Sequence, residues 1–115
     1  MENVSLEEKI NQLSFQMELL LGAVDWSERP FEHEVLKANL TRQEVVAFFA
    51  LLDDIRERQN EQMRYGLSSV EPLLVHFVGM LHPQLEAETI LAACVRQGMA
   101  LDVTEPLYRQ VKLLY

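Results

Sequence analysis

The chain has 115 residues, is 49% hydrophobic, and carries a formal net charge of −8 with a sequence pI of about 4.8. This length predicts one domain over residues 1–115 with a modest core. The negative charge repels phosphate backbones and anionic headgroups, so it argues against nucleic acids and membranes as partners. No apolar run reaches about 18 residues, and the first residues are acidic where a secretory signal is basic, which predicts a cytoplasmic protein.

The first stretch of the chain predicts a helix that associates with another helix. Ser5 and Glu8 form a capping-box pattern, and the helix should run over residues 6–24. Its apolar residues alternate at spacings of four and three through about three heptads, the pattern of a coiled-coil seam. The partner helix belongs to this chain or to another copy. We predict self-assembly, with an oligomer interface made of Leu6, Ile10, Leu13, Met17, Leu20 and Val24.

The same helix has a second apolar face. Phe15 and Leu19 lie roughly 140° to 200° around the helix from Ile10, on the side opposite the seam. A surface helix of a small monomer needs one apolar stripe. We therefore expect one face to pack on the chain's own bundle and the other on a second copy; the alternative is that one bundle buries both.

The next segments predict a corner and two further helices. The proline in residues 25–30 interrupts the first pattern, and a short helix over 31–38 follows. A capping box of Thr41 with Glu44 predicts a long helix toward Tyr65, stopped by Gly66. Its second half, residues 56–62, lacks apolar side chains and is expected to be a solvated arm, supported by the pairs Asp54–Arg58 and Glu61–Arg64. Alternatively, Gln59 and Gln62 line a polar groove or a contact between subunits that sets their register.

Three more helices complete the expected fold. Ser68 with Glu71 predicts the start of a helix ending at Leu81, and Gly98 should terminate a helix over 86–97. Thr104 is expected to cap the last helix, with Pro106 in its first turn. The fold class is therefore all-α: a small self-assembling bundle of about five to six helices with an N-terminal heptad helix.

Gly79 stands inside an apolar helix, where glycine costs about 1 kcal/mol relative to alanine. This predicts that another helix or an aromatic ring, such as Phe15 or Phe49, closely approaches its backbone. On this hypothesis Gly79→Leu destabilises the fold by overpacking.

Residues that carry chemistry are few. His33, His76 and His82 have no metal-binding spacing, so we predict no metal site, and there is no glycine-rich phosphate loop. His76 is expected at the polar edge of its helix, or as a buried proton switch. Cys94, the single cysteine, rules out an internal disulfide, fits a reducing compartment and is expected to lie in the core. The sequence predicts no enzyme, no catalytic residue and no cofactor.

Several residues together resemble a known family. They are the Pro30-Phe31 corner, Phe77-x-Gly79-x-Leu81, Leu85 with Glu88-Thr89-Ile90, and the Gln97-Gly98 stop. Over nearly the whole chain they are similar to the YhaI-like proteins of Gram-positive bacilli, a small bacterial family of unknown function. The resemblance implies an all-helical, cytosolic protein that forms an oligomer, for example a trimer. It implies no catalytic or binding residue.

Two classes of function follow from these observations. The first is a homo-oligomeric protein-interaction scaffold or regulator, whose partners are other copies of the chain and a further, unidentified protein. The second is a small-ligand sensor or enzyme with a site between subunits, using His76, His33 or Tyr65 as polar contacts. DNA binding by a helix-turn-helix over residues 41–66 is disfavoured by four carboxylates on its helix: Asp53, Asp54, Glu57 and Glu61.

Overall fold

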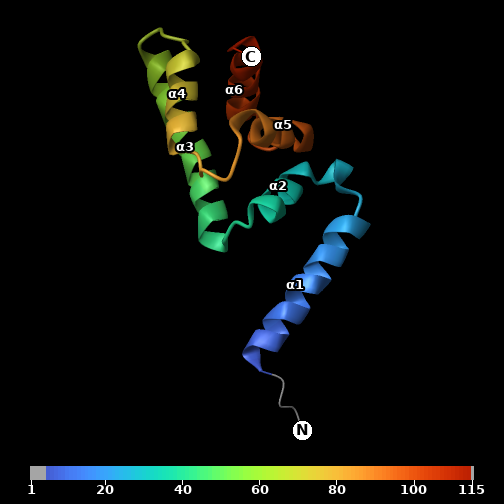
Figure 1. The fold of residues 1–115 in the computed structure, drawn as a ribbon. Coiled ribbons are helices and arrows are strands. Elements are labelled where there is room, and N and C mark those ends of the chain that lie inside the picture. The colour runs from blue at the N-terminus through green and yellow to red at the C-terminus, as the bar shows by residue number, and fades with distance from the viewer. Residues whose placement is uncertain (1–4, 115) are drawn as a thin grey trace.

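The computed structural model describes residues 5–114, and within them the chain forms six α-helices, one 3-10 turn and no strand (Figure 1). The all-α prediction is confirmed. The elements are α1 (Leu6–Ala23), η1 (Trp26–Glu28), α2 (Pro30–Ala38), α3 (Arg42–Arg64), α4 (Glu71–Met80), α5 (Ala87–Gln97) and α6 (Leu101–Leu114).

Local signals set most of the helix ends. The Ser5 hydroxyl accepts from the Glu8 backbone N–H at 3.1 Å, and Thr41 accepts from the Glu44 N–H at the same distance, so both capping boxes are confirmed. Gly66 and Gly98 adopt φ angles of 73° and 70°, the left-handed region in which glycine avoids the steric cost of a Cβ.

Two predicted helix starts are wrong. The predicted capping box of Ser68 with Glu71 does not form: α4 begins at Glu71 after Val70, without a side-chain cap. Helix α6 begins at Leu101, so Thr104 lies inside the helix and is wholly buried. Its hydroxyl lies 2.9 Å from the Met99 carbonyl oxygen and 3.1 Å from that of Ala100.

Burial explains the early start of α6. Its core-facing residues Val103, Leu107 and Val111 are spaced by four, so the stripe requires helical geometry from before Thr104. Pro106 then falls in the helix interior rather than in the first turn.

Helices α2 to α6 form a body around one apolar core. Phe48 contacts Phe31 and Phe77, with ring centroids 5.6 and 6.2 Å apart. Long-range packing joins α5 to α6 and α2, and α3 to α4 and α6. The core residues are Phe31, Phe48, Leu51, Leu52, Ile55, Leu73, Leu74, Phe77, Ile90, Leu91, Ala93, Cys94, Val103, Leu107 and Val111.

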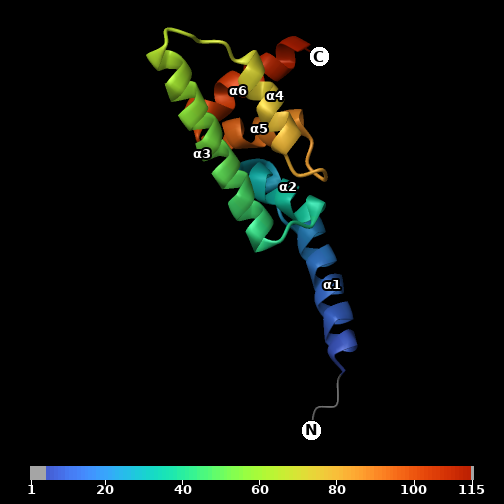
Figure 2. The ribbon, with the colours of Figure 1, turned by 90° about the vertical axis from the view of Figure 1, so that its left-hand side faces the viewer.

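Helix α1 extends away from this body, as both views of the ribbon show (Figures 1 and 2). The molecule measures 68 × 25 × 21 Å, and its radius of gyration is 17.9 Å. A compact domain of 115 residues would have a radius of gyration of about 13 Å. The chain is therefore an arm, α1, attached to a body, α2 to α6.

The accessible surface is also larger than that of a compact monomer. It is 8192 Å², whereas a folded monomer of 13.3 kDa exposes about 6,450 Å². The excess is about 1,700 Å². Within residues 5–114, no helix combines the length and apolar character needed to cross a bilayer.

Candidate functional site

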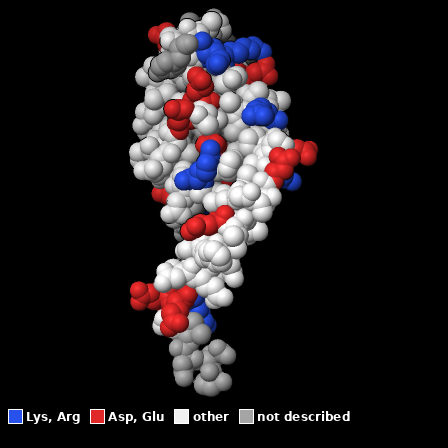
Figure 3. All heavy atoms as spheres, turned by 45° about the vertical axis from the view of Figure 1, so that its right-hand side comes forward, with Lys and Arg blue, Asp and Glu red and all other residues white. Residues whose placement is uncertain are grey.

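The arm α1 carries the predicted interface, and none of its residues is buried. The six seam residues all lie exposed, from 40% for Met17 to 75% for Leu6. Phe15 and Leu19, on the opposite side, are 57% and 56% exposed. In Figure 3 the middle of the arm is a largely uncharged surface, with acidic residues gathered near its free end.

This arrangement corrects the expectation about the two faces of the first helix. Neither face packs on the chain's own body, and the alternative that one bundle buries both faces is also wrong. The physical reason is the direction of the chain at residues 24–29, which turns α1 away from the core instead of folding it back. Within the protomer, the apolar surface of α1 is therefore exposed to solvent.

The corner at residues 24–29 holds the arm in place. The Trp26 indole N–H donates to the Leu21 carbonyl oxygen at 2.9 Å, which satisfies one of the carbonyls left free at the end of α1. The Trp26 ring stacks on His33 of α2, with centroids 5.1 Å apart and planes 7° apart. Asp25 accepts from the Ser27 N–H at 3.0 Å, and this bond lowers the pKa of its carboxyl. The direction of α1 is thus coupled to α2 by Trp26.

A second apolar surface lies on the body, at a groove of about 830 Å³ between α4, the start of α5 and the end of α6. Val75, Val78 and Leu114 in its wall are more than half exposed. The complete lining is Leu74, Val75, Val78, Gly79, Leu85, Glu86, Ala87, Glu88, Val111 and Leu114.

Gly79 lies in the wall of this groove, which corrects the prediction made for it. A Cβ atom added at Gly79 would meet no atom within 4 Å, so neither Phe15 nor Phe49 fills that space. The glycine faces an opening and not a packed neighbour. Overpacking inside the protomer is therefore not the expected effect of Gly79→Leu.

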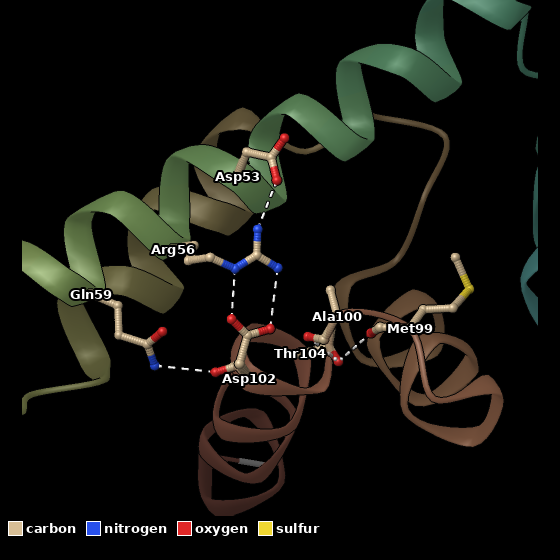
Figure 4. Close-up of polar contacts among 7 residues, drawn as sticks. All are labelled: Asp53, Arg56, Gln59, Met99, Ala100, Asp102 and Thr104. Carbon is tan, nitrogen blue, oxygen red and sulfur yellow. Dashed lines mark hydrogen bonds and ion pairs between the residues drawn. The ribbon is translucent and has the colours of Figure 1, made fainter.

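The polar half of α3 is more engaged than a solvated arm. Arg56 donates to both carboxylate oxygens of Asp102 in α6, at 2.6 and 3.1 Å, and to Asp53 at 2.8 Å (Figure 4). Arg56 lowers the pKa of Asp102, and the Asp102 carboxylate raises the pKa of Arg56 above its ordinary value. The Asp54–Arg58 pair is confirmed at 3.0 Å, but among residues 5–114 no ion pair joins Glu61 to Arg64.

Gln59 has a structural role that the sequence analysis missed. In a helix, the Asp102 carbonyl would accept from the N–H of residue 106, but Pro106 has none. The Gln59 side chain donates to that carbonyl at 3.2 Å, as Figure 4 shows. A proline inside a helix, with its free carbonyl four residues earlier, is the signal that could have prompted a search for such a donor.

The three histidines do not converge. His76 Nε2 lies 2.8 Å from Asp54 Oδ2, and His82 Nε2 lies 2.8 Å from Glu44 Oε2, so both link the α4 region to α3. The bond to His76 is the main cause that lowers the pKa of Asp54. His33 stacks on Trp26. None of the polar contacts proposed for a ligand site, namely His33, His76 and Tyr65, lines the apolar groove.

Cys94 is wholly buried, which confirms its predicted place in the core. Burial raises the pKa of its thiol to about 12, so the thiol stays protonated at neutral pH. In the part of the chain that the structure describes, no cluster of three or more His, Cys, Asp or Glu side chains is arranged to hold a metal ion.

Gln97 is a second residue whose role was missed. Its Oε1 accepts from the Phe31 backbone N–H at 2.5 Å, and its Nε2 donates to Glu32 at 3.1 Å. Helix α2 has no side-chain cap of its own, so a residue of α5 satisfies one of its free N–H groups. No local pattern announces this contact, because the two residues are 66 positions apart.

One comparison with known proteins matches nearly the whole chain. The family model described as "Protein of unknown function (DUF1878)" covers residues 2–112. The match therefore includes the exposed arm as well as the body.

Proposed function

The chain belongs to the DUF1878 family of proteins of unknown function, and we propose that it is a homo-oligomeric protein-interaction module that assembles through the seam of α1. The supporting observation is the unburied arm: a helix with seven large apolar side chains exposed and none buried, followed by the exposed Val24. In water such a surface is unfavourable, and covering it is the main driving force for association.

The size of the exposed surface suits an interface between copies. Obligate homodimers bury about 2,000 to 5,000 Å² in total, or roughly half of that on each protomer. The excess of about 1,700 Å² on this chain falls in that range. The seam of Leu6, Ile10, Leu13, Met17, Leu20 and Val24 supplies the heptad geometry for pairing α1 with α1 of another copy.

The cellular role that fits such a module is a scaffold or regulator without catalytic activity. Its net charge of −8 favours a positively charged surface on any further protein partner. A bacterial origin, a cytoplasmic location and membership among the YhaI-like proteins complete this proposal. They are supported by the residues that carry the resemblance and by the lone, buried cysteine.

The test is the mass of the protein in solution, measured by light scattering on the wild type and on Ile10→Glu/Met17→Glu. Two buried charges in the seam are incompatible with an apolar interface, so the variant should be a monomer where the wild type is an oligomer. Because α1 contributes nothing to the core of the body, circular dichroism should show that helices α2 to α6 remain folded.

A matched control adds the same charge outside the seam. Gln43→Glu/Ala47→Glu places two carboxylates at exposed positions of α3, away from α1 and from the groove, and should leave the oligomer intact. A monomeric wild type at high protein concentration would contradict the proposal. An oligomer that the seam charges do not disturb would contradict the assignment of the seam.

A further inference from the structure

A seam between α1 helices leaves the second face of the arm uncovered. Phe15 and Leu19 are followed by Gly22 and Ala23, so the four residues occupy positions i, i+4, i+7 and i+8 and form one ridge. This is the spacing with which an amphipathic helix anchors in a groove. We call these four residues the second ridge. A coiled-coil seam is a narrow stripe and cannot cover a ridge on the opposite side.

The groove on the body is a concave apolar surface of the kind that receives a helix ridge. The groove between α4 and α6 has exposed apolar walls at Val75, Val78 and Leu114. At Gly79 the space that a Cβ would enter is open, and the same is true of Gly22 on the second ridge. A helix can therefore approach close to the backbone of α4. Within the protomer nothing uses this opening, although glycine weakens a helix relative to alanine.

The arm of the same chain cannot fill the groove. The groove is lined by α4, the start of α5 and the end of α6. Figure 1 shows that α1 runs away from these helices. Trp26 bonds to the last turn of α1 and stacks on α2, which holds the arm in that direction. Any α1 helix in the groove must therefore come from another copy.

The large exposed surface of the protomer favours a second copy of the chain, rather than a small molecule, as the occupant of the groove. The protomer exposes about 1,700 Å² more than a compact monomer, and the ridge and the groove both contribute to this excess. A ligand in the groove would leave Phe15 and Leu19 in water, whereas a second copy covers the ridge and the groove together. Each protomer carries one ridge and one groove, so repeated docking satisfies every copy in a closed assembly.

We propose that the second ridge of α1, formed by Phe15, Leu19, Gly22 and Ala23, seats in the groove between α4 and α6 of a second copy of this chain. The proposal rests on the self-assembly described above and adds the receiving surface. In the assembly α1 is thus covered on two sides, by α1 of another copy along the seam and by the body of another copy along the ridge.

Disulfide trapping tests the contact. A tagged Leu19→Cys chain is mixed with an untagged Val78→Cys chain in a glutathione buffer, and the products are alkylated and separated by size. A mixed dimer of the two chains is expected, and Cys94 does not interfere because it is buried. Val46→Cys is the matched control, since Val46 is also an exposed valine, 60% against 51% for Val78, but lies on α3. Trapping to Val46 as strong as to Val78 would overturn the proposal.

A variant that can form a disulfide with its own copy separates the groove proposal from the proposal of assembly through the seam. Leu13→Cys alone reports the seam, because two seam residues of paired α1 helices face each other. If Leu13→Cys forms a dimer and the Leu19–Val78 pair does not, the groove is wrong and seam assembly stands. If neither forms and the wild type is a monomer by light scattering, both proposals are wrong.

Filling the groove gives a second, independent measurement. A leucine at position 79 has open space in the protomer and favours the helix, so Gly79→Leu should remain folded by circular dichroism. It should nevertheless raise the dissociation constant of the oligomer roughly tenfold, because the side chain occupies the place of the ridge. The smaller Gly79→Ala should have a lesser effect. An unchanged dissociation constant for Gly79→Leu would contradict the docking.

Discussion

The arm and the body of this protein form helices from the same kinds of local sequence signal, but they differ in whether the protomer buries their apolar side chains. Helix α1 has 18 residues, a complete capping box and two apolar faces, yet it buries none of its side chains. Helix α5 has only 11 residues and no side-chain cap at its start, yet Ile90, Leu91 and Cys94 are wholly buried. The helical pattern says which faces are apolar, and only the tertiary arrangement says whether the same chain covers them.

The largest expected effect separates the body from the arm. Phe77→Ala removes a wholly buried ring from the core and should lower the free energy of unfolding of the protomer by about 3 to 5 kcal/mol. Leu13→Ala, in the exposed seam, should change it by less than about 0.5 kcal/mol at protein concentrations where the oligomer has dissociated. Urea unfolding of dilute protein measures both, and a large loss for Leu13→Ala would mean that α1 packs on its own body.

An intermediate effect is expected at the contact between Gln59 and the Asp102 carbonyl. Gln59→Ala should cost about 1 kcal/mol, because a helix carbonyl loses its donor beside Pro106. In a Pro106→Ala background the backbone N–H of residue 106 can take over, so the same Gln59 substitution should cost less. A double-mutant cycle measured by urea unfolding gives the coupling, and additive effects would refute this role of Gln59.

The smallest expected effect is the loss of stability of the body at acidic pH. Hydrogen bonds lower the pKa values of three carboxyls that join helices, from 3.8 for Asp54 and Asp102 and from 4.5 for Glu44. Each therefore contributes stability that is fully present above these unfolded-state values and is lost as the pH falls through the lower folded-state pKa. The free energy of unfolding should be level from pH 7 to about pH 5 and then decrease toward pH 3. Asp102→Asn should make this decrease shallower.

The sequence predicted the helices where the signal is local. Ser5 with Glu8, Thr41 with Glu44, and the left-handed Gly66 and Gly98 act within one turn of the chain, so their effect can be recognised without a fold. Prediction was wrong where burial overrode such a signal. Thr104 has the residue type of a helix cap, but the apolar stripe of α6 needs that position inside the helix.

The candidate interface was found only in part. The heptad seam is visible in the sequence because its spacing is regular, and the second ridge is visible as an apolar face opposite to it. The groove is not visible, because Val78 of α4 and Leu114 of α6 come from separate segments. Gly79 was correctly singled out as unusual, but the sequence placed its neighbour within the protomer, where the structure has open space.

Periodicity, capping residues and glycines thus determined by themselves that the chain is helical, approximately where its helices lie, and that its first helix is apolar on two sides. The tertiary structure alone decided that neither side meets the body, that Gln59 and Gln97 serve distant backbone groups, and that a groove opens at Gly79. The physical reason is range. Hydrogen bonds within a helix and capping boxes depend on residues a few positions apart. Burial, and contacts such as those of Gln59 and Gln97, depend on which segments meet in space.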